Sequence, residues 1–269
     1  MNKNNAIYKS LRSAYYSVKN LPETIKRIND THSVKKYKNI HKGESCFIIG
    51  NGPSMTMDDL NKVCELNVPS FACNKIFLAF DETKWRPTYY LASDTKILAD
   101  VDINNIGIPC KNMFFPRWGK KDLNNKKCNY YQTLEHDWLH SDKFSTDAYV
   151  GIYGRETIII EAVQLAYYMG FSKVYIIGVD FSYNMKKVDK ENLTFENGEG
   201  NYFIKDYAKQ GQVLNLPNQE ANILGFQAAR KAFEENGREI YNATRGGMLE
   251  VFIRKDLDEV FKEIEVNQR

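Results

Sequence analysis

Short polar and glycine-rich segments follow several apolar runs in this 269-residue sequence. The runs are "CFII", "PSFAC", "TYYLA" and "VYIIGV". The residues that end them are Gly50, Asn51, Gly52, Pro53, Ser54, Asn74, Ser93, Asp94 and Asp180. Glycines let a ligand approach the backbone closely, and amide, hydroxyl and carboxylate groups hydrogen-bond to phosphates, sugars and bases. We therefore predict that these residues line a nucleotide-binding site.

The segment "GNGPS" differs from the two common phosphate-binding loops. It lacks the third glycine of GxGxxG, and Pro53 removes a backbone N–H that a dinucleotide loop would direct at a pyrophosphate. No GK[ST] follows it, so it is not a Walker A loop either. The Asn51 amide and the Ser54 hydroxyl, beside an expected helix N-terminus, suit a nucleotide phosphate or sugar. A tight turn without a ligand is the alternative interpretation.

Four further polar residues are candidates for chemistry. Arg155 begins an apolar helical segment, where its charge opposes the helix dipole, so we expect it to face an anionic ligand. A surface ion pair is the alternative. Asp206, Tyr207 and Glu220 flank a polar segment, and each could act as a general base or be a solvated loop residue.

The histidines and cysteines of the sequence do not form a metal-binding pattern. His136 and His140 lie in an irregular aromatic segment without an HExxH pattern. The five cysteines are widely spaced with no CxxC pair, which is typical of reduced thiols in a cytoplasmic protein. We expect no metal and no cofactor.

Alternating strand and helix patterns surround these residues. The expected strands are residues 45–50, 68–74, 87–94, 108–116, 173–182 and 238–244, and the expected helices are 55–66, 154–170, 220–237 and 256–266. Ser54 is the expected N-cap of the first of these helices. This order predicts an α/β, Rossmann-like fold with a mainly parallel sheet and helices on both faces. A loop-rich lid is expected at 184–216, and in such sheets ligands bind beyond the carboxyl ends of the strands.

The charge of the chain is concentrated in its first 42 residues. Ten Lys and Arg face two acidic residues there, a net charge of +8, so the remainder carries −5 of the total of +3. Apolar residues also recur at helical spacing, namely Ile7, Leu11, Ala14, Tyr15 and Val18. We predict a basic amphipathic arm, 1–42, before one domain, 43–269. The arm could lie on an anionic membrane or pack on its own domain or on a second subunit.

Composition excludes other classes of protein. The basicity is confined to the arm, so nucleic-acid binding is not expected. No run of about 18 apolar residues predicts a transmembrane helix, and the N-terminus lacks an apolar signal core. The expected location is cytoplasmic, with possible contact of the arm with the inner face of the cell membrane.

Four segments together resemble a known family. They are "FIIGNGPSM", "FACNKIF", "GRETIIIEAVQLAYYMGFSKVYIIGVDFSY" and "EIYNAT", and they occur in the order seen in bacterial sialyltransferases of the Campylobacter lipooligosaccharide type. They are also similar to the wider group that contains the Maf flagellin glycosyltransferases and the hydroxymethylpterin pyrophosphokinase-like proteins. The resemblance covers residues 44–255, and the ending "YNATRGGMLEVF" is closer to the Maf branch.

The resemblance implies a metal-independent transferase that uses a CMP-activated nonulosonic (sialic-type) acid and a glycan or lipid-linked acceptor. It places Asn51 to Ser54 beside cytidine monophosphate, Asn74 at the donor phosphate or sugar, and Asp180 near the ribose. Lid tyrosines help the phosphate leave, and the candidates here are Tyr183, Tyr202 and Tyr207. The sialyltransferases use a lid histidine as base, but this chain has none after His140, so Glu220 or Asp206 is expected in that role.

Two other hypotheses remain open. A pyrophosphokinase acting on a pterin-like alcohol would need ATP, magnesium and clustered carboxylates, which Asp94 and Asp180 could supply. A non-catalytic module with a degenerate nucleotide pocket is the third hypothesis, and the missing histidine favours it.

Overall fold

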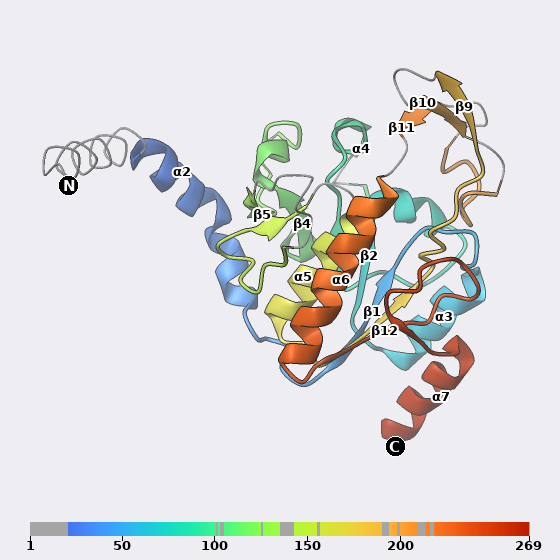
Figure 1. The fold of residues 1–269 in the computed structure, drawn as a ribbon. Coiled ribbons are helices and arrows are strands. Elements are labelled where there is room, and N and C mark those ends of the chain that lie inside the picture. The colour runs from blue at the N-terminus through green and yellow to red at the C-terminus, as the bar shows by residue number, and fades with distance from the viewer. Residues whose placement is uncertain are drawn as a thin grey trace, which may run out of the picture.

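The computed structural model describes residues 21–100, 102, 105–124, 126–134, 143–154, 157–189, 194–197, 200–208, 213–215 and 218–268. Its centre is an eight-stranded sheet with the strand order β13-β12-β8-β1-β2-β3-β4-β5 (Figure 1). The strands are β1 (Ser45–Ile49), β2 (Ser70–Cys73), β3 (Tyr89–Leu91), β4 (Met113–Pro116), β5 (Asn129–Tyr131), β8 (Lys173–Ile177), β12 (Glu239–Asn242) and β13 (Ile253–Arg254). All neighbouring strands in this sheet pair in parallel.

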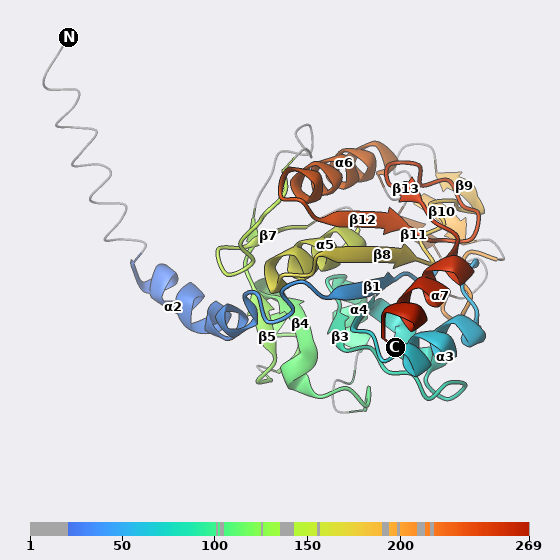
Figure 2. The same cartoon turned by 90° about the horizontal axis from the view of Figure 1, so that it is seen from below.

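Helices cover both faces of the sheet. The α-helices are α2 (Leu21–Thr31), α3 (Met57–Leu66), α4 (Thr95–Asp100), α5 (Ile158–Met169), α6 (Gln219–Glu235) and α7 (Leu257–Asn267). The 3₁₀ helices are η1 (His32–Tyr37), η2 (Asn74–Ala79), η3 (Cys110–Asn112) and η4 (Arg117–Lys120). Viewed from below, α5 and α6 lie on one side of the sheet and α3 and α7 on the other (Figure 2). The predicted Rossmann-like fold is confirmed.

Alternating side chains of β1 build the two layers of the core. Phe47 and Ile49 pack in the cluster that contains residues of α3 and α7, whereas Cys46 and Ile48 pack in the cluster of α5 and α6. Successive side chains of a strand point to opposite faces, so a strand covered on both faces must be apolar throughout. This explains why the residues of the run "CFII" are all apolar and do not alternate between apolar and polar.

The helix boundaries follow from local capping, with one correction to the sequence prediction. Thr56, and not Ser54, is the N-cap of α3: its Oγ1 accepts a hydrogen bond from the Asp59 N–H at 3.1 Å, and the Asp59 carboxylate accepts one from the Thr56 N–H at 3.0 Å. This reciprocal pair is a capping box. At the end of α5, Gly170 has a φ of 96°, as predicted for a glycine C-cap.

Two smaller sheets accompany the main sheet. The strands β6 (Thr133–Leu134) and β7 (Ile152–Tyr153) form a parallel pair. Within the predicted lid, β9 (Met185–Asp189), β10 (Thr194–Asn197) and β11 (Val213–Asn215) form an antiparallel sheet beyond the main one (Figure 1). Among the described helices, none has the length and apolar character needed to cross a membrane.

The described part of the N-terminal segment contacts the main domain. Val34 and Tyr37 of η1 are buried in the cluster of α5 and α6, and the His41 ring stacks on Phe171 at 4.4 Å. Preceding this contact, α2 extends along the side of the molecule (Figure 1). Residues 1–20, and with them the apolar positions 7 to 18 of the predicted arm, lie outside the described residues.

Candidate functional site

The predicted site residues after β1 and β8 are brought together. β1 lies between β8 and β2, and the chain runs outward from β1 in both directions. Such a switch in strand order opens a crevice beyond the carboxyl ends of the strands. The loops after β1 and β8 are joined there by a hydrogen bond from the Gly52 N–H to the Gly178 carbonyl at 2.9 Å.

Both glycines of "GNGPS" sit too close to the β8 loop to carry a side chain. A Cβ on Gly50 would lie 2.2 Å from the Gly178 carbonyl oxygen, and one on Gly52 would lie 1.9 Å from Asp180 Oδ2. The prediction explained these glycines by the close approach of a ligand. The structure adds a second reason, because the two loops pack directly against each other.

Asp180 is a buried carboxylate that is held by the segment after β1. Its Oδ2 accepts a hydrogen bond from Ser54 Oγ at 2.8 Å, and its carbonyl oxygen accepts one from the Met248 N–H at 2.7 Å. The next residue, Phe181, has a φ of 56°, which is uncommon for a bulky side chain. Strained backbone of this kind often occurs at functional sites, where surrounding contacts hold it.

Two amide oxygens in the segments that follow β1 and β2 have no hydrogen-bond partner among the described residues. Asn51 Nδ2 donates to the Cys73 carbonyl at 3.2 Å, so the Asn51 side chain reaches the end of β2. Asn74 follows directly and has a φ of 56°. The Oδ1 atoms of both asparagines are buried and unpaired. Leaving such acceptors unpaired costs free energy, and a ligand with N–H or O–H donors would satisfy them.

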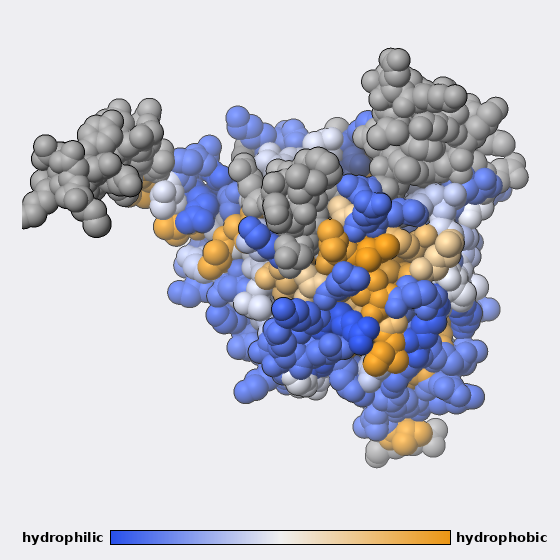
Figure 3. All heavy atoms as spheres, viewed as in Figure 1, coloured by the Kyte–Doolittle hydropathy of each residue, from blue (hydrophilic) through white to orange (hydrophobic). Residues whose placement is uncertain are grey.

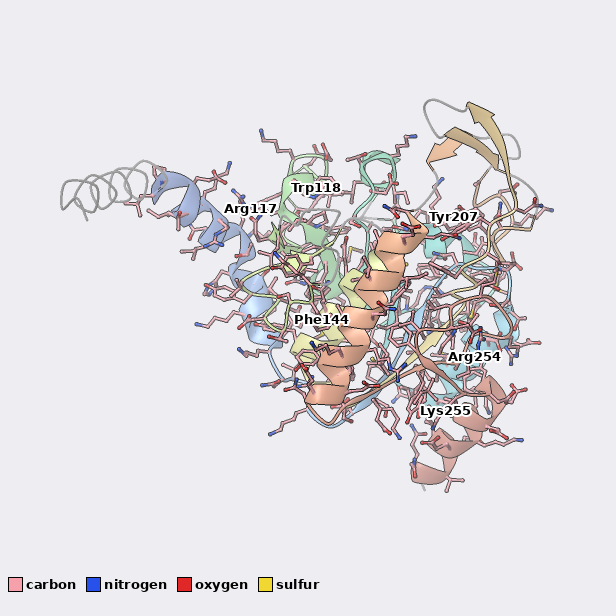
Figure 4. The ribbon with its side chains drawn as sticks, in the orientation of Figure 1. Arg117, Trp118, Phe144, Tyr207, Arg254 and Lys255 are labelled. Atoms are coloured by element: carbon pink, nitrogen blue, oxygen red, sulfur yellow. The ribbon has the colours of Figure 1, made fainter. Side chains whose placement is uncertain are left out.

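Tyr207 closes over the same asparagines. Its hydroxyl forms a hydrogen bond with the Asn74 side chain, its ring stacks on Tyr202 with centroids 4.0 Å apart, and the Phe203 N–H donates to the Asn51 carbonyl at 3.3 Å. Burial raises the pKa of Tyr207 well above its ordinary value, so its hydroxyl stays protonated at neutral pH. Figure 4 places Tyr207 below the small lid sheet, at the same end of the main sheet.

One residue at this edge was missed by the sequence prediction. Glu161 of α5 is only 4% exposed, and its carboxylate accepts hydrogen bonds from the Tyr131 and Ser93 hydroxyls. Burial raises its pKa to about 7. The available signal was its position, since Glu161 is the one charged residue of the helical run "IIIEAVQLAYYM".

The other predicted residues are less closely connected to this group. Asp94 is exposed and its Oδ1 accepts hydrogen bonds from the Lys96 and Ile97 N–H groups, so it caps α4. Asp206 and Glu220 are exposed, in the 201–208 loop and the first turn of α6. Pro53 is exposed as well. Arg155 lies outside the described residues.

A groove adjoins the carboxyl end of β8, because Phe181 lines it directly after Asp180. It has a volume of about 450 Å³ and lies between α6 and the 248–251 loop. Its apolar residues are Phe181, Ile223, Met248, Leu249 and Val251. Hydrophobic surface gathers beside α6 on this face of the molecule (Figure 3). In the described part of the chain, no three His, Cys, Asp or Glu side chains come together as a metal-binding group.

Comparison with known proteins gives one family and two similar folds. The model of the family described as "6-hydroxymethylpterin diphosphokinase MptE-like" matches residues 17–186. No curated protein sequence matches the chain. A Maf glycosyltransferase from Magnetospirillum magneticum AMB-1 superposes with a TM-score of 0.50 and 14% identity, over 90% of this chain and 41% of that one. The chain thus spans about two fifths of its length.

The second similar structure is the sialyltransferase CstII from Campylobacter jejuni, solved in complex with a substrate analogue, cytidine-5'-monophosphate. Its TM-score is 0.46 with 13% identity, over 79% of this chain and 85% of that one. At these identities the likeness of the Maf protein concerns the fold alone. The matched range of the family model includes Asn51, Asn74, Glu161 and Asp180.

Proposed function

Because the chain belongs to the 6-hydroxymethylpterin diphosphokinase MptE-like family, we propose that it is a transferase whose activated donor binds at the carboxyl edge of the sheet. The donor we propose is a CMP-activated nonulosonic acid, and the group is transferred to a glycan or lipid-linked acceptor. The order of the motifs "GNGPS", "CN" and "GVDF" supports this choice. Tyr207, hydrogen-bonded to Asn74, supplies a hydroxyl for the phosphate.

One observation carries the proposal: the Oδ1 atoms of Asn51 and Asn74 are buried and have no hydrogen-bond partner among the described residues. Two neighbouring acceptors suit a ligand that presents several donors, as the amino group of cytosine and the ribose hydroxyls do. Asp180, fixed by Ser54, is a third acceptor at the same edge. Together these residues suit the nucleoside part of the donor better than a bare phosphate, which carries acceptors.

In the proposed reaction, the bond between the sugar and the phosphate oxygen breaks and its electron pair leaves with CMP. Tyr207 donates a hydrogen bond to the leaving phosphate, which is stabilised as its charge grows. Arg155 is proposed as a second group that faces this phosphate. The 184–216 lid would exclude water, because hydrolysis of the activated sugar is the competing reaction.

We also propose that the N-terminal segment holds the protein at an anionic membrane surface, close to a lipid-linked acceptor. Leu21, Ile25 and Ile28 form an exposed apolar stripe on α2, being 52%, 49% and 42% exposed. The two acidic residues of this segment, Glu23 and Asp30, pair with Arg117. The other charged residues of positions 1–42 are all Lys or Arg, and such a basic segment suits anionic headgroups.

A nucleotide panel tests the donor proposal. The melting temperature of the full chain is measured with CMP, CDP, UDP, GDP and ATP, each with and without magnesium. Stabilisation by CMP without magnesium is the expected outcome, because a ligand that binds only the native state raises stability. Asn74→Ala should abolish the shift. Stabilisation by ATP and magnesium alone would overturn the proposal.

The family description favours one second candidate, a diphosphokinase that acts on 6-hydroxymethylpterin. This reaction transfers the terminal diphosphate of ATP to the pterin alcohol and releases AMP. Incubation with ATP, magnesium and the pterin, followed by chromatography for AMP, distinguishes the two. AMP release that depends on the pterin would establish this second candidate, whereas CMP release from CMP-N-acetylneuraminate supports the first.

A further inference from the structure

Glu161 lies in an environment that is unfavourable for a carboxylate with a purely structural role. The side chain is 4% exposed on α5, and none of the described residues forms an ion pair with it. Its partners are two hydroxyls, from Tyr131 on β5 and from Ser93. Burying a carboxylate without a cation is costly, so a structural role would be filled at lower cost by an amide or an apolar residue.

The carboxylate lies near the carboxyl ends of β2 and β3. Ser93 follows the carboxyl end of β3, and Cys73, whose thiol is close enough to interact electrostatically with Glu161, ends β2. A Cβ on Gly154 would lie 2.3 Å from Glu161 Oε1, so the backbone at Gly154 covers that oxygen. Ser93 is only partly buried whereas Tyr131 is fully buried, so the Ser93 hydroxyl is the more accessible of the two groups that hydrogen-bond to the carboxylate.

Among the described titratable groups packed together here, which are Glu161, Cys73 and Tyr131, Glu161 is the one that exchanges a proton near neutrality. Burial raises its pKa to about 7, although the hydrogen bonds from Tyr131 and Ser93 oppose this rise. Burial, with a contribution from Glu161, raises the pKa of the Cys73 thiol to about 12 and that of the Tyr131 hydroxyl well above its ordinary value. Both neighbours therefore stay protonated while Glu161 gains or loses its proton.

We propose that Glu161 accepts the proton of the attacking hydroxyl through Ser93, as a positioning residue that does not itself touch the substrate. The inference rests on the proposed transfer from a CMP-activated donor. The acceptor O–H bond breaks as its oxygen bonds to the sugar carbon. Its proton passes to Ser93 Oγ, the proton of Ser93 passes to the Glu161 carboxylate, and the electron pair of the broken sugar–phosphate bond leaves with CMP.

The test uses the full chain with CMP-N-acetylneuraminate, water being the acceptor. The release of CMP is followed from pH 5 to 9 after the uncatalysed rate is subtracted. In the wild type, kcat should rise to a plateau above about pH 7, because the carboxylate form accepts the proton. Glu161→Gln should lower kcat at pH 8 by about 100-fold and remove this rise, with KM within about two-fold of the wild type.

Two further variants keep the test independent of a loss of fold. Tyr131→Phe retains the carboxylate but removes a hydrogen bond that lowers its pKa, so the rise of kcat should move to higher pH and reach the same plateau. Ser93→Ala should lose as much activity as Glu161→Gln, and the double variant should lose no more, because both act in one proton path. A purely structural role would not move the pH profile.

The outcomes separate this inference from the proposed function. A Glu161→Gln variant that binds CMP and keeps more than half of the wild-type kcat at pH 8 overturns the role of Glu161 alone. The same conclusion follows if the pH profile of Tyr131→Phe coincides with that of the wild type. A wild type that neither binds CMP by calorimetry nor releases it from the donor overturns the proposed function, and this inference with it.

Discussion

Asp180 and Gly52 show how single residues set the shape of the candidate site. The Asp180 carboxylate occupies the space where a side chain at position 52 would begin, and Ser54 fixes it from the same loop. Each of the two loops therefore positions the other. Contacts between the segments that follow β1 and β8 therefore determine the shape of the candidate nucleotide-binding site.

We predict that Gly52→Ala destabilises the protein and weakens CMP binding. The added Cβ would meet Asp180 Oδ2 at 1.9 Å, so the carboxylate must move. Overpacking of this kind costs about 1–3 kcal/mol. Urea unfolding measures the free energy, and calorimetry measures CMP binding. In an Asp180→Ala background the same substitution should cost less, and an equal cost in both backgrounds would show that the contact is not responsible.

The polar residues at the strand ends could be predicted from the sequence, but the buried hydrogen bonds of Glu161 could not. Asn51, Asn74 and Asp180 stand out because polar groups after apolar runs are conspicuous, and the structure brings them to one edge. Glu161 depends on Tyr131 and Ser93, which are distant in the chain and meet it only through the fold. Position-by-position analysis cannot reveal such a contact.

At the scale of elements, Thr56 and Ser54 have different roles at the N-terminus of α3. Thr56 and Asp59 form the capping box, whereas Ser54 binds Asp180. We predict that Thr56→Ala destabilises the protein by about 1 kcal/mol and speeds hydrogen exchange at the Asp59 amide, which loses its acceptor. Amide exchange measured by NMR checks this. Ser54→Ala should leave the exchange of Asp59 unchanged, and equal acceleration in both variants would contradict the assignment.

The long elements were predictable and the short ones were not. The sequence predicted α5 and β8 in the right places, because apolar helices and buried strands carry clear patterns. The expected ranges, 154–170 and 173–182, are longer than the observed helix of twelve residues and strand of five. β6 and β7 have two residues each, too few to show a period, so the sequence pattern did not predict them. The lid strands β9 to β11 pair antiparallel with one another, and no pattern of neighbouring residues in the sequence predicted that pairing.

At the scale of the whole molecule, the N-terminal segment has one face against the domain and one free of it. Val34 and Tyr37 are buried, and Asp30 pairs with both Arg117 and Lys120. Figure 4 shows Arg117 close to α2. The buried residues of η1 attach the segment to the domain by apolar packing, and the half-buried ion pairs of Asp30 add to this contact. The ion pairs orient α2 and neutralise its acidic residues Glu23 and Asp30.

This arrangement predicts that the stripe on α2 governs membrane binding. Ile25→Asn with Ile28→Asn should weaken binding of the full chain to vesicles of anionic lipid by about 10-fold, because apolar burial at the interface is lost. Co-sedimentation measures the bound fraction, which should also fall as salt is added. Ile253→Asn is the matched control, since Ile253 is 59% exposed on β13. A comparable loss in the control, or binding to neutral vesicles at the same strength, would contradict a specific role for α2.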